Sequence, residues 1–194
     1  FIGTVSPAGG NLKDPVTEST KKAARCFYAL EQNRADQKRY PAVNPIDSYS
    51  KYLEYPEIQQ YLDENVDKGW VEKVAEAKNL VRRGKEANDQ INILGDDGVP
   101  MSYHERFWKS ELIDFILLQQ DGFDPIDCNA PMERQKYMLE LVLDICSKEF
   151  KFEDYEQCRE YFKNMVNVLK QMNYSEFPSE QFDRYREELN QILA

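Results

Sequence analysis

Hydrophobic residues recur every three or four positions over most of the chain after residue 50, which is the period of an amphipathic helix. The clearest series keeps this spacing over five intervals: Tyr155, Cys158, Phe162, Met165, Leu169 and Met172. A second series follows Ser179, a favourable N-cap, and consists of Phe182, Tyr185, Leu189 and Ile192. The pattern predicts two helices with apolar faces turned to a core, because such stripes are far more often core than ligand site.

Further helices are predicted between residues 70 and 147. A long helix should end at Gly95, with its stripe formed by Trp70, Val74, Ala77, Val81, Asn88 and Ile91. Ser102 and Glu105 are spaced as a capping box, and Gly122 would close the helix that they open. The apolar side of that helix is expected near Phe107, Glu111, Phe115 and Leu118. The stretch Asn129–Pro131 should start another helix, with the stripe Met138, Leu141, Val142 and Ile145. Short turns between such helices indicate an antiparallel bundle.

The first 50 residues have a different pattern. Phe1–Val5 is expected to form a short strand, and the glycine-rich stretch Ser6–Leu12 a loop. Asp14 and Pro15 are typical of a helix start, and this helix is expected to reach about Asn33, with the stripe Val16, Thr20, Ala23, Phe27 and Leu30. A strand followed by a helix is one unit of an α/β sheet. The predicted fold is therefore mainly α, an antiparallel helical bundle preceded by a small α/β part.

The segment Tyr40–Ser50 reads Y-P-A-V-N-P-I-D-S-Y-S. Pro41 and Pro45 fix φ and each removes a backbone donor, so the segment is a rigid connector that cannot be helical before about Ile46. Asp47 and Ser48 are favourable first residues for a following helix. On local physics alone, the ordinary interpretation of this segment is a proline-rich connection between domains.

Composition narrows the possible functions. The 194 residues are 41% hydrophobic and 31% charged, with a formal net charge of −10. This acidity argues against nucleic acid as a partner, and no run approaches the ~18 apolar residues of a membrane span, so no direct membrane insertion is expected. The lone His104 is far in sequence from all four cysteine residues, Cys26, Cys128, Cys146 and Cys158. Reduced thiols in a cytoplasm are therefore expected, and no metal site.

Several short motifs stand out along the chain. They are Ser6–Gly10 with Asp14–Thr17, Phe27–Leu30 (F-Y-A-L), Tyr40–Ser50, Gln119–Asp124 (Q-Q-D-G-F-D) and Gln135–Leu139 (Q-K-Y-M-L). In this order and at this spacing they resemble motifs of the catalytic A (alpha) subunit of V-type and archaeal-type rotary ATPases. The spelling of Ser48–Ser50 favours that subunit over its non-catalytic homologue, the B type, and over the F-type β chain. A phosphate-binding loop, G-x-x-x-x-G-K-[ST], does not occur, so the resemblance implies the C-terminal part of the subunit.

The resemblance implies a domain organisation and a function. Residues 1–50 would be the C-terminal edge of a nucleotide-binding α/β domain that includes the Tyr40–Ser50 segment, and residues 51–194 a helical C-terminal domain. The intact subunit would bind ATP or ADP with Mg²⁺ and couple ATP hydrolysis or synthesis to rotor movement and transport of H⁺ or Na⁺. The implied partners are the non-catalytic B-type subunits and other A copies in an A3B3-type hexamer, together with central stalk subunits. The implied location is the cytoplasm, peripheral to the membrane in the ATPase head. Alone, this chain is expected to hold no nucleotide and to be inactive.

Three residues carry the implied nucleotide site. In the family, the aromatic residue before the proline of the connector, and the Gln and Phe of the Gln-Gln motif, surround the adenine. These positions are Tyr40, Gln119 and Phe123 here. An aromatic face can stack on a base and a Gln amide can donate and accept on its edge. Leu117 stands where the family usually has Phe. The residue that would form the third apolar wall of the adenine pocket is therefore not assigned. No catalytic residue is assigned to the chain.

Two alternatives remain from the residues alone. Tyr40 and Phe123 could simply pack between domains, which is the more common role of such rings. The whole chain could also be an all-α interaction or scaffold module without any nucleotide role, as acidic, tyrosine-rich bundles often are.

Overall fold

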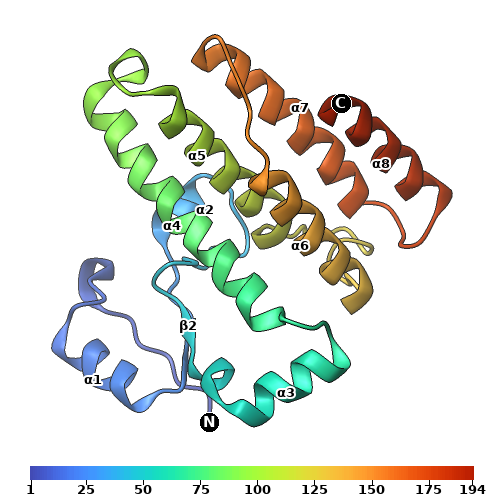
Figure 1. The fold of residues 1–194 in the computed structure, drawn as a ribbon. Helices are drawn as coiled ribbons and strands as arrows, with labels where there is room; N and C mark the ends of the chain where they lie inside the picture. The colour runs from blue at the N-terminus through green and yellow to red at the C-terminus, as the bar shows by residue number, and fades with distance from the viewer.

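Eight α-helices and one two-stranded sheet make up the computed structural model, which describes residues 1–194 (Figure 1). The helices are α1 (Pro15–Ala23), α2 (Gln32–Asp36), α3 (Pro56–Asn65), α4 (Trp70–Leu94), α5 (Met101–Ile113), α6 (Met132–Ser147), α7 (Tyr155–Asn173) and α8 (Glu180–Leu193). The strands are β1 (Cys26–Phe27) and β2 (Tyr49–Ser50). The predicted mainly α fold with a C-terminal helical bundle is confirmed.

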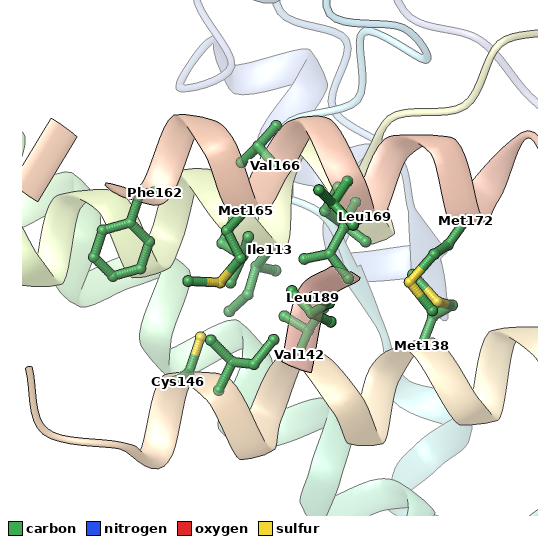
Figure 2. Packing of buried hydrophobic residues seen from close by; sticks show 14 of the residues in the cluster. Ile113, Met138, Val142, Cys146, Phe162, Met165, Val166, Leu169, Met172 and Leu189 are labelled. Atoms are coloured by element: carbon green, nitrogen blue, oxygen red, sulfur yellow. The ribbon is translucent and has the colours of Figure 1, made fainter. Parts of the chain in front are cut away.

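The core lies between α5, α6, α7 and α8. Five apolar residues of the predicted α7 stripe are fully buried: Cys158, Phe162, Met165, Leu169 and Met172. Figure 2 shows the α7 side chains facing Val142 and Cys146 of α6, with Ile113 of α5 and Leu189 of α8 alongside. Each fully buried side chain of this size contributes about 1.5–3 kcal/mol relative to an exposed one. The apolar period therefore identified the faces that hold the bundle together.

Polar residues fix the ends of these helices. The Asp154 carboxylate accepts a hydrogen bond from the backbone N–H of Gln157 at 2.8 Å, and the Ser179 hydroxyl accepts one from Phe182 at 3.1 Å. Gly95 has a φ of 81°, in the left-handed region that glycine adopts without strain, and it ends α4 as predicted. Caps of this kind typically contribute about 1 kcal/mol each.

The helix α5 differs from its prediction at both ends. It begins at Met101, with Pro100 in the N-cap position, so Ser102 lies inside the first turn and no side chain caps it. At its other end α5 continues into the π-helical turn η4 (Asp114–Leu118) and stops before Gln119, not at Gly122. The buried face is also rotated from the predicted one, with Leu112, Ile113 and Ile116 inside.

In the first 50 residues, the predicted helix start at Asp14 and Pro15 is confirmed, but several other predicted elements are wrong. Phe1–Val5 forms no strand, and α1 ends at Ala23 rather than near Asn33. β1 instead pairs antiparallel with β2, with Phe27 opposite Tyr49. Leu30, placed on the predicted stripe, is 76% exposed. Asp47 and Ser48 start no helix, because β2 follows them directly and α3 begins only at Pro56.

Candidate functional site

The three predicted site residues lie around one hollow. Tyr40 comes from the stretch after α2, whereas Gln119 and Phe123 belong to the loop between η4 and α6. The hollow has a volume of about 860 Å³, and α7 contributes Lys170 and Asn173 to its wall. Two stretches that are far apart in the sequence are thus brought together at one place on the surface.

Tyr40 is fixed through its backbone while its ring stays accessible. Its carbonyl oxygen accepts a hydrogen bond from the N–H of Gln120 at 2.9 Å, which joins the two stretches directly. The hydroxyl donates to the carbonyl of Ala35 at 3.4 Å, and 54% of the residue is exposed. Pro41 follows through a cis peptide bond. The ring is therefore held at the edge of the hollow with surface available for contact.

Phe123 is fully exposed. Its backbone N–H donates to the Asp121 carboxylate at 2.9 Å, which shapes the turn after Gln120. An apolar ring left in water gains free energy when another surface covers it. The exposed ring is therefore suited to stacking on a flat ligand or to packing against a further domain.

The Gln119 side chain carries an unsatisfied hydrogen-bond donor. Its Nε2 is buried and has no hydrogen-bond partner. The residue lines both the hollow and a smaller cavity of about 330 Å³, whose wall also includes Trp70 and Met138. A buried donor without a partner costs about 1–3 kcal/mol. A ligand with an acceptor at this position would remove that cost.

Arg134 holds the loop that carries Phe123. The side chain is almost fully buried, and its guanidinium donates to the carbonyl oxygens of Asn173 at 2.8 Å and Ile126 at 3.1 Å. Its Nη2 also lies 3.7 Å from the Asp127 carboxylate. This one side chain therefore links the loop after η4 to the end of α7.

The two carboxylates that line the hollow, Asp121 and Asp127, already accept hydrogen bonds from other groups of the protein. Asp127 accepts a hydrogen bond from the N–H of Asp121 at 2.6 Å. Burial raises the pKa of Asp127, and this hydrogen bond together with the charge of Arg134 opposes the shift. Asp121 accepts from Phe123 and, at 3.4 Å, from the Tyr174 hydroxyl. No group of three or more His, Cys, Asp or Glu residues is placed to hold a metal ion.

Asn44 organises the Tyr40–Ser50 segment. Its side-chain oxygen accepts from the N–H groups of Ile46 at 2.8 Å and Asp47 at 3.0 Å, and its amide donates to Glu31 at 3.0 Å. The Ser48 hydroxyl accepts from the N–H of Ala29 at 3.0 Å. The segment is a connector braced by side chains, as its two prolines predict, but it leads into β2 rather than into a helix.

Arg34, Arg39, Glu111 and Asp114 form an ion-pair cluster outside the hollow. Arg34 contacts Asp114 at 2.7 Å, and Arg39 binds Glu111 through two hydrogen bonds of 2.8 and 2.9 Å and also pairs with Asp114. The cluster joins the first 50 residues to α5 and η4. Sequence reasoning missed it, as well as Arg134 and Lys170, and only the placement of Glu111 within a largely apolar stripe hinted at a buried partner.

Comparison with known proteins finds relatives that align with nearly all of this chain. No family model matches the chain. The V-type ATP synthase alpha chain of Chlamydia abortus is 38% identical over 193 residues, which are 100% of this chain and 32% of that protein. The alpha chain of Protochlamydia amoebophila is 36% identical over 191 residues, or 98% of this chain and 32% of the relative.

The chain belongs to the V-type ATP synthase alpha-chain family. It corresponds to the C-terminal part of its members and spans about a third of their length. Among solved structures, a protein described as a unique ATP synthase subunit, NeqB from Nanoarcheaum equitans, superposes with a TM-score of 0.56. That match covers 74% of this chain and 33% of the other at 18% identity, so it supports the fold of this part of the alpha chain. No helix in the structure is both long and apolar enough to cross a membrane.

Proposed function

We propose that the chain forms the adenine end of the ATP site in the catalytic subunit of a rotary V-type ATP synthase or ATPase. Tyr40 and Phe123 would contact the faces of the base, and the Gln119 amide its edge. The observation that carries the proposal is the hollow that these three residues share, although they come from two distant stretches of the chain. The V-type ATP synthase names of the relatives support ATP as the nucleotide.

The chain supplies binding surface rather than reactive groups in this proposal. Phosphoryl transfer needs backbone amides and a Lys around the phosphates, together with ligands for Mg²⁺. Asp121 and Asp127 are engaged by backbone N–H groups and by Arg134, so the hollow offers no free pair of carboxylates for the ion. We therefore assign Mg²⁺ and the phosphates to residues of the subunit outside this chain.

Replacing Phe123 by Ala in the complete subunit, assembled into its complex, tests the proposal. Base stacking on an aromatic ring contributes roughly 1–3 kcal/mol, so the KM for ATP should rise about tenfold or more. The kcat should change little, because the base is stacked in the ground state and in the transition state alike. Steady-state ATP hydrolysis measures both constants.

Tyr61→Ala is the matched control. Tyr61 lies on α3 and is 61% exposed, but it does not line the hollow. Its replacement should leave the KM unchanged. A Phe123→Ala enzyme with normal KM would refute the adenine assignment. If its kcat were normal as well, a scaffold role would be favoured. If its kcat collapsed, a role in the chemical step would be indicated.

The tip of the α4–α5 hairpin is the proposed contact with the central stalk. Ile93 is 74% exposed and Leu94 57% exposed, immediately before the turn at Gly95–Pro100 (Figure 1). Two exposed aliphatic side chains at the end of a long helix are suited to a moving apolar contact. The proposed partners are therefore the stalk at this tip, and non-catalytic B-type subunits and further alpha chains elsewhere in the hexamer.

A further inference from the structure

Lys170 is a cation in the wall of the hollow that the proposed site does not use. It projects from α7 and lines the hollow together with Tyr40 and Phe123. Its ammonium lies 4.4 Å from the centroid of the Phe115 ring, and the Arg39 guanidinium lies 5.0 Å from the same centroid. A cation within about 6 Å of a ring face is attracted to it. Phe115 therefore keeps the lysine at the wall.

The two cations at this ring differ in what neutralises them. Glu111 and Asp114 bind Arg39. Burial and the charge of Arg39 lower the pKa of Lys170, and no carboxylate raises it again. The carboxylates nearest to the hollow, Asp121 and Asp127, are engaged by other donors. Lys170 is thus a partly desolvated donor without an acceptor.

We propose that Lys170 donates a hydrogen bond to a ring nitrogen of the base bound in this hollow, and so helps to select the base. This role rests on the proposed function. An ammonium group has three donors and no acceptor, so it recognises only acceptor atoms. A purine carries its acceptor nitrogens in the plane of the ring, where a base stacked on Tyr40 or Phe123 would turn them toward the wall. The aromatic rings would hold the faces of the base, and Lys170 would hold one edge.

Lys170→Met in the complete subunit, assembled into its complex, tests this role. Methionine keeps a flexible apolar stem over Phe115 while it removes the donor. The KM and kcat are measured with ATP and with 1-deaza-, 3-deaza- and 7-deaza-ATP, each of which lacks one ring nitrogen. With ATP the KM should rise about tenfold at nearly constant kcat, since hydrogen bonds to charged groups are strong. For one of the three analogues the variant and the wild type should have the same KM, because the acceptor is already missing.

Lys38→Met is the matched control for loss of charge. Lys38 lines the same hollow, but it is exposed and lies over no aromatic ring. Its replacement should change the KM by one common factor for ATP and all three analogues. Lys170→Arg, which keeps a donor, should recover part of the affinity for ATP. The proposal is overturned if Lys170→Met leaves the KM for ATP unchanged, or raises it by the same factor for all four nucleotides.

The two proposals can fail separately. If Phe123→Ala raises the KM and Lys170→Met behaves like its control, the adenine assignment stands and the role of Lys170 falls. If Phe123→Ala leaves the KM unchanged, the proposed function falls, and the role of Lys170 falls with it.

Discussion

Burial separates the four cysteine residues into two pairs. Cys146 and Cys158 are buried, and this burial raises the pKa of each thiol to about 12, whereas Cys128 is exposed and Cys26 half-buried. Because the thiolate is the reactive species, iodoacetamide at pH 8 should modify Cys128 first and Cys26 next. Cys146 and Cys158 should react only after unfolding in urea. Mass spectrometry of tryptic peptides measures the order, and early labelling of Cys158 would contradict the packing of α7.

The residues of the hollow, and Arg134, which holds the adjoining loop, differ in how far the sequence reveals them. Tyr40 and Phe123 have local marks, a proline after one ring and a glycine before the other, and the resemblance placed them at one site. Lys170 and Arg134 sit inside helical patterns where a basic residue is ordinary. Their roles depend on which distant segments pack against them, and a single sequence does not contain that information.

At the scale of secondary-structure elements, the close approach of α4 and α5 depends on Gly84. A Cβ atom added there would lie 1.9 Å from Cβ of Ser110 and 3.1 Å from the carbonyl oxygen of Arg106. In an open helix, Gly→Ala would stabilise by about 0.5–1 kcal/mol, but forced overpacking typically costs about 1–3 kcal/mol. Gly84→Ala should therefore lower the free energy of unfolding by about 1–2 kcal/mol in urea titrations.

The matched variants show whether crowding is the cause. Gly3→Ala adds a methyl group where nothing lies within 4 Å, and it should leave stability unchanged. Ser110→Gly combined with Gly84→Ala should recover part of the loss, seen as a coupling free energy in a double-mutant cycle. A fully additive cycle would show that the two residues do not compete for space.

The spacing of apolar residues predicts a helix well where one face of the helix is buried and the other is exposed to solvent. This holds for α7 and α8, whose stripes became the core. It fails for α5, where Pro100 takes the N-cap position two residues before Ser102, and where Leu112, Ile113 and Ile116 are buried instead of the predicted positions. It also fails in residues 1–50, where Ser48, Asn44 and short backbone pairings decide the structure. Those contacts involve residues of the Tyr40–Ser50 connector, and they do not recur at the three- or four-residue spacing of a helix.

At the scale of the whole molecule, the ion-pair cluster joins residues 1–50 to the helical part. The side chains of Arg34 and Asp114 are 10% and 7% exposed, so loss of one charge leaves the other poorly solvated. Asp114→Asn should therefore lower the free energy of unfolding by about 3 kcal/mol. It should also speed tryptic cleavage within residues 1–50, which gel electrophoresis and mass spectrometry would follow. Asp67→Asn is the control, because Asp67 also pairs with two cations, Lys73 and Lys136, but only within residues 51–194.

The pattern of unfolding in Asp114→Asn also bears on the proposed boundary between residues 1–50 and 51–194. The core cluster draws nearly all its members from the helices after residue 70, so the bundle has a hydrophobic interior of its own. If the boundary is real, the variant should lose protection first in residues 1–50 while hydrogen exchange in α6 and α7 stays slow. A single transition in which α7 and the Tyr40–Ser50 segment lose protection together would mean that the chain unfolds as one unit. In that case the cluster would be part of one common core and not a joint between two domains.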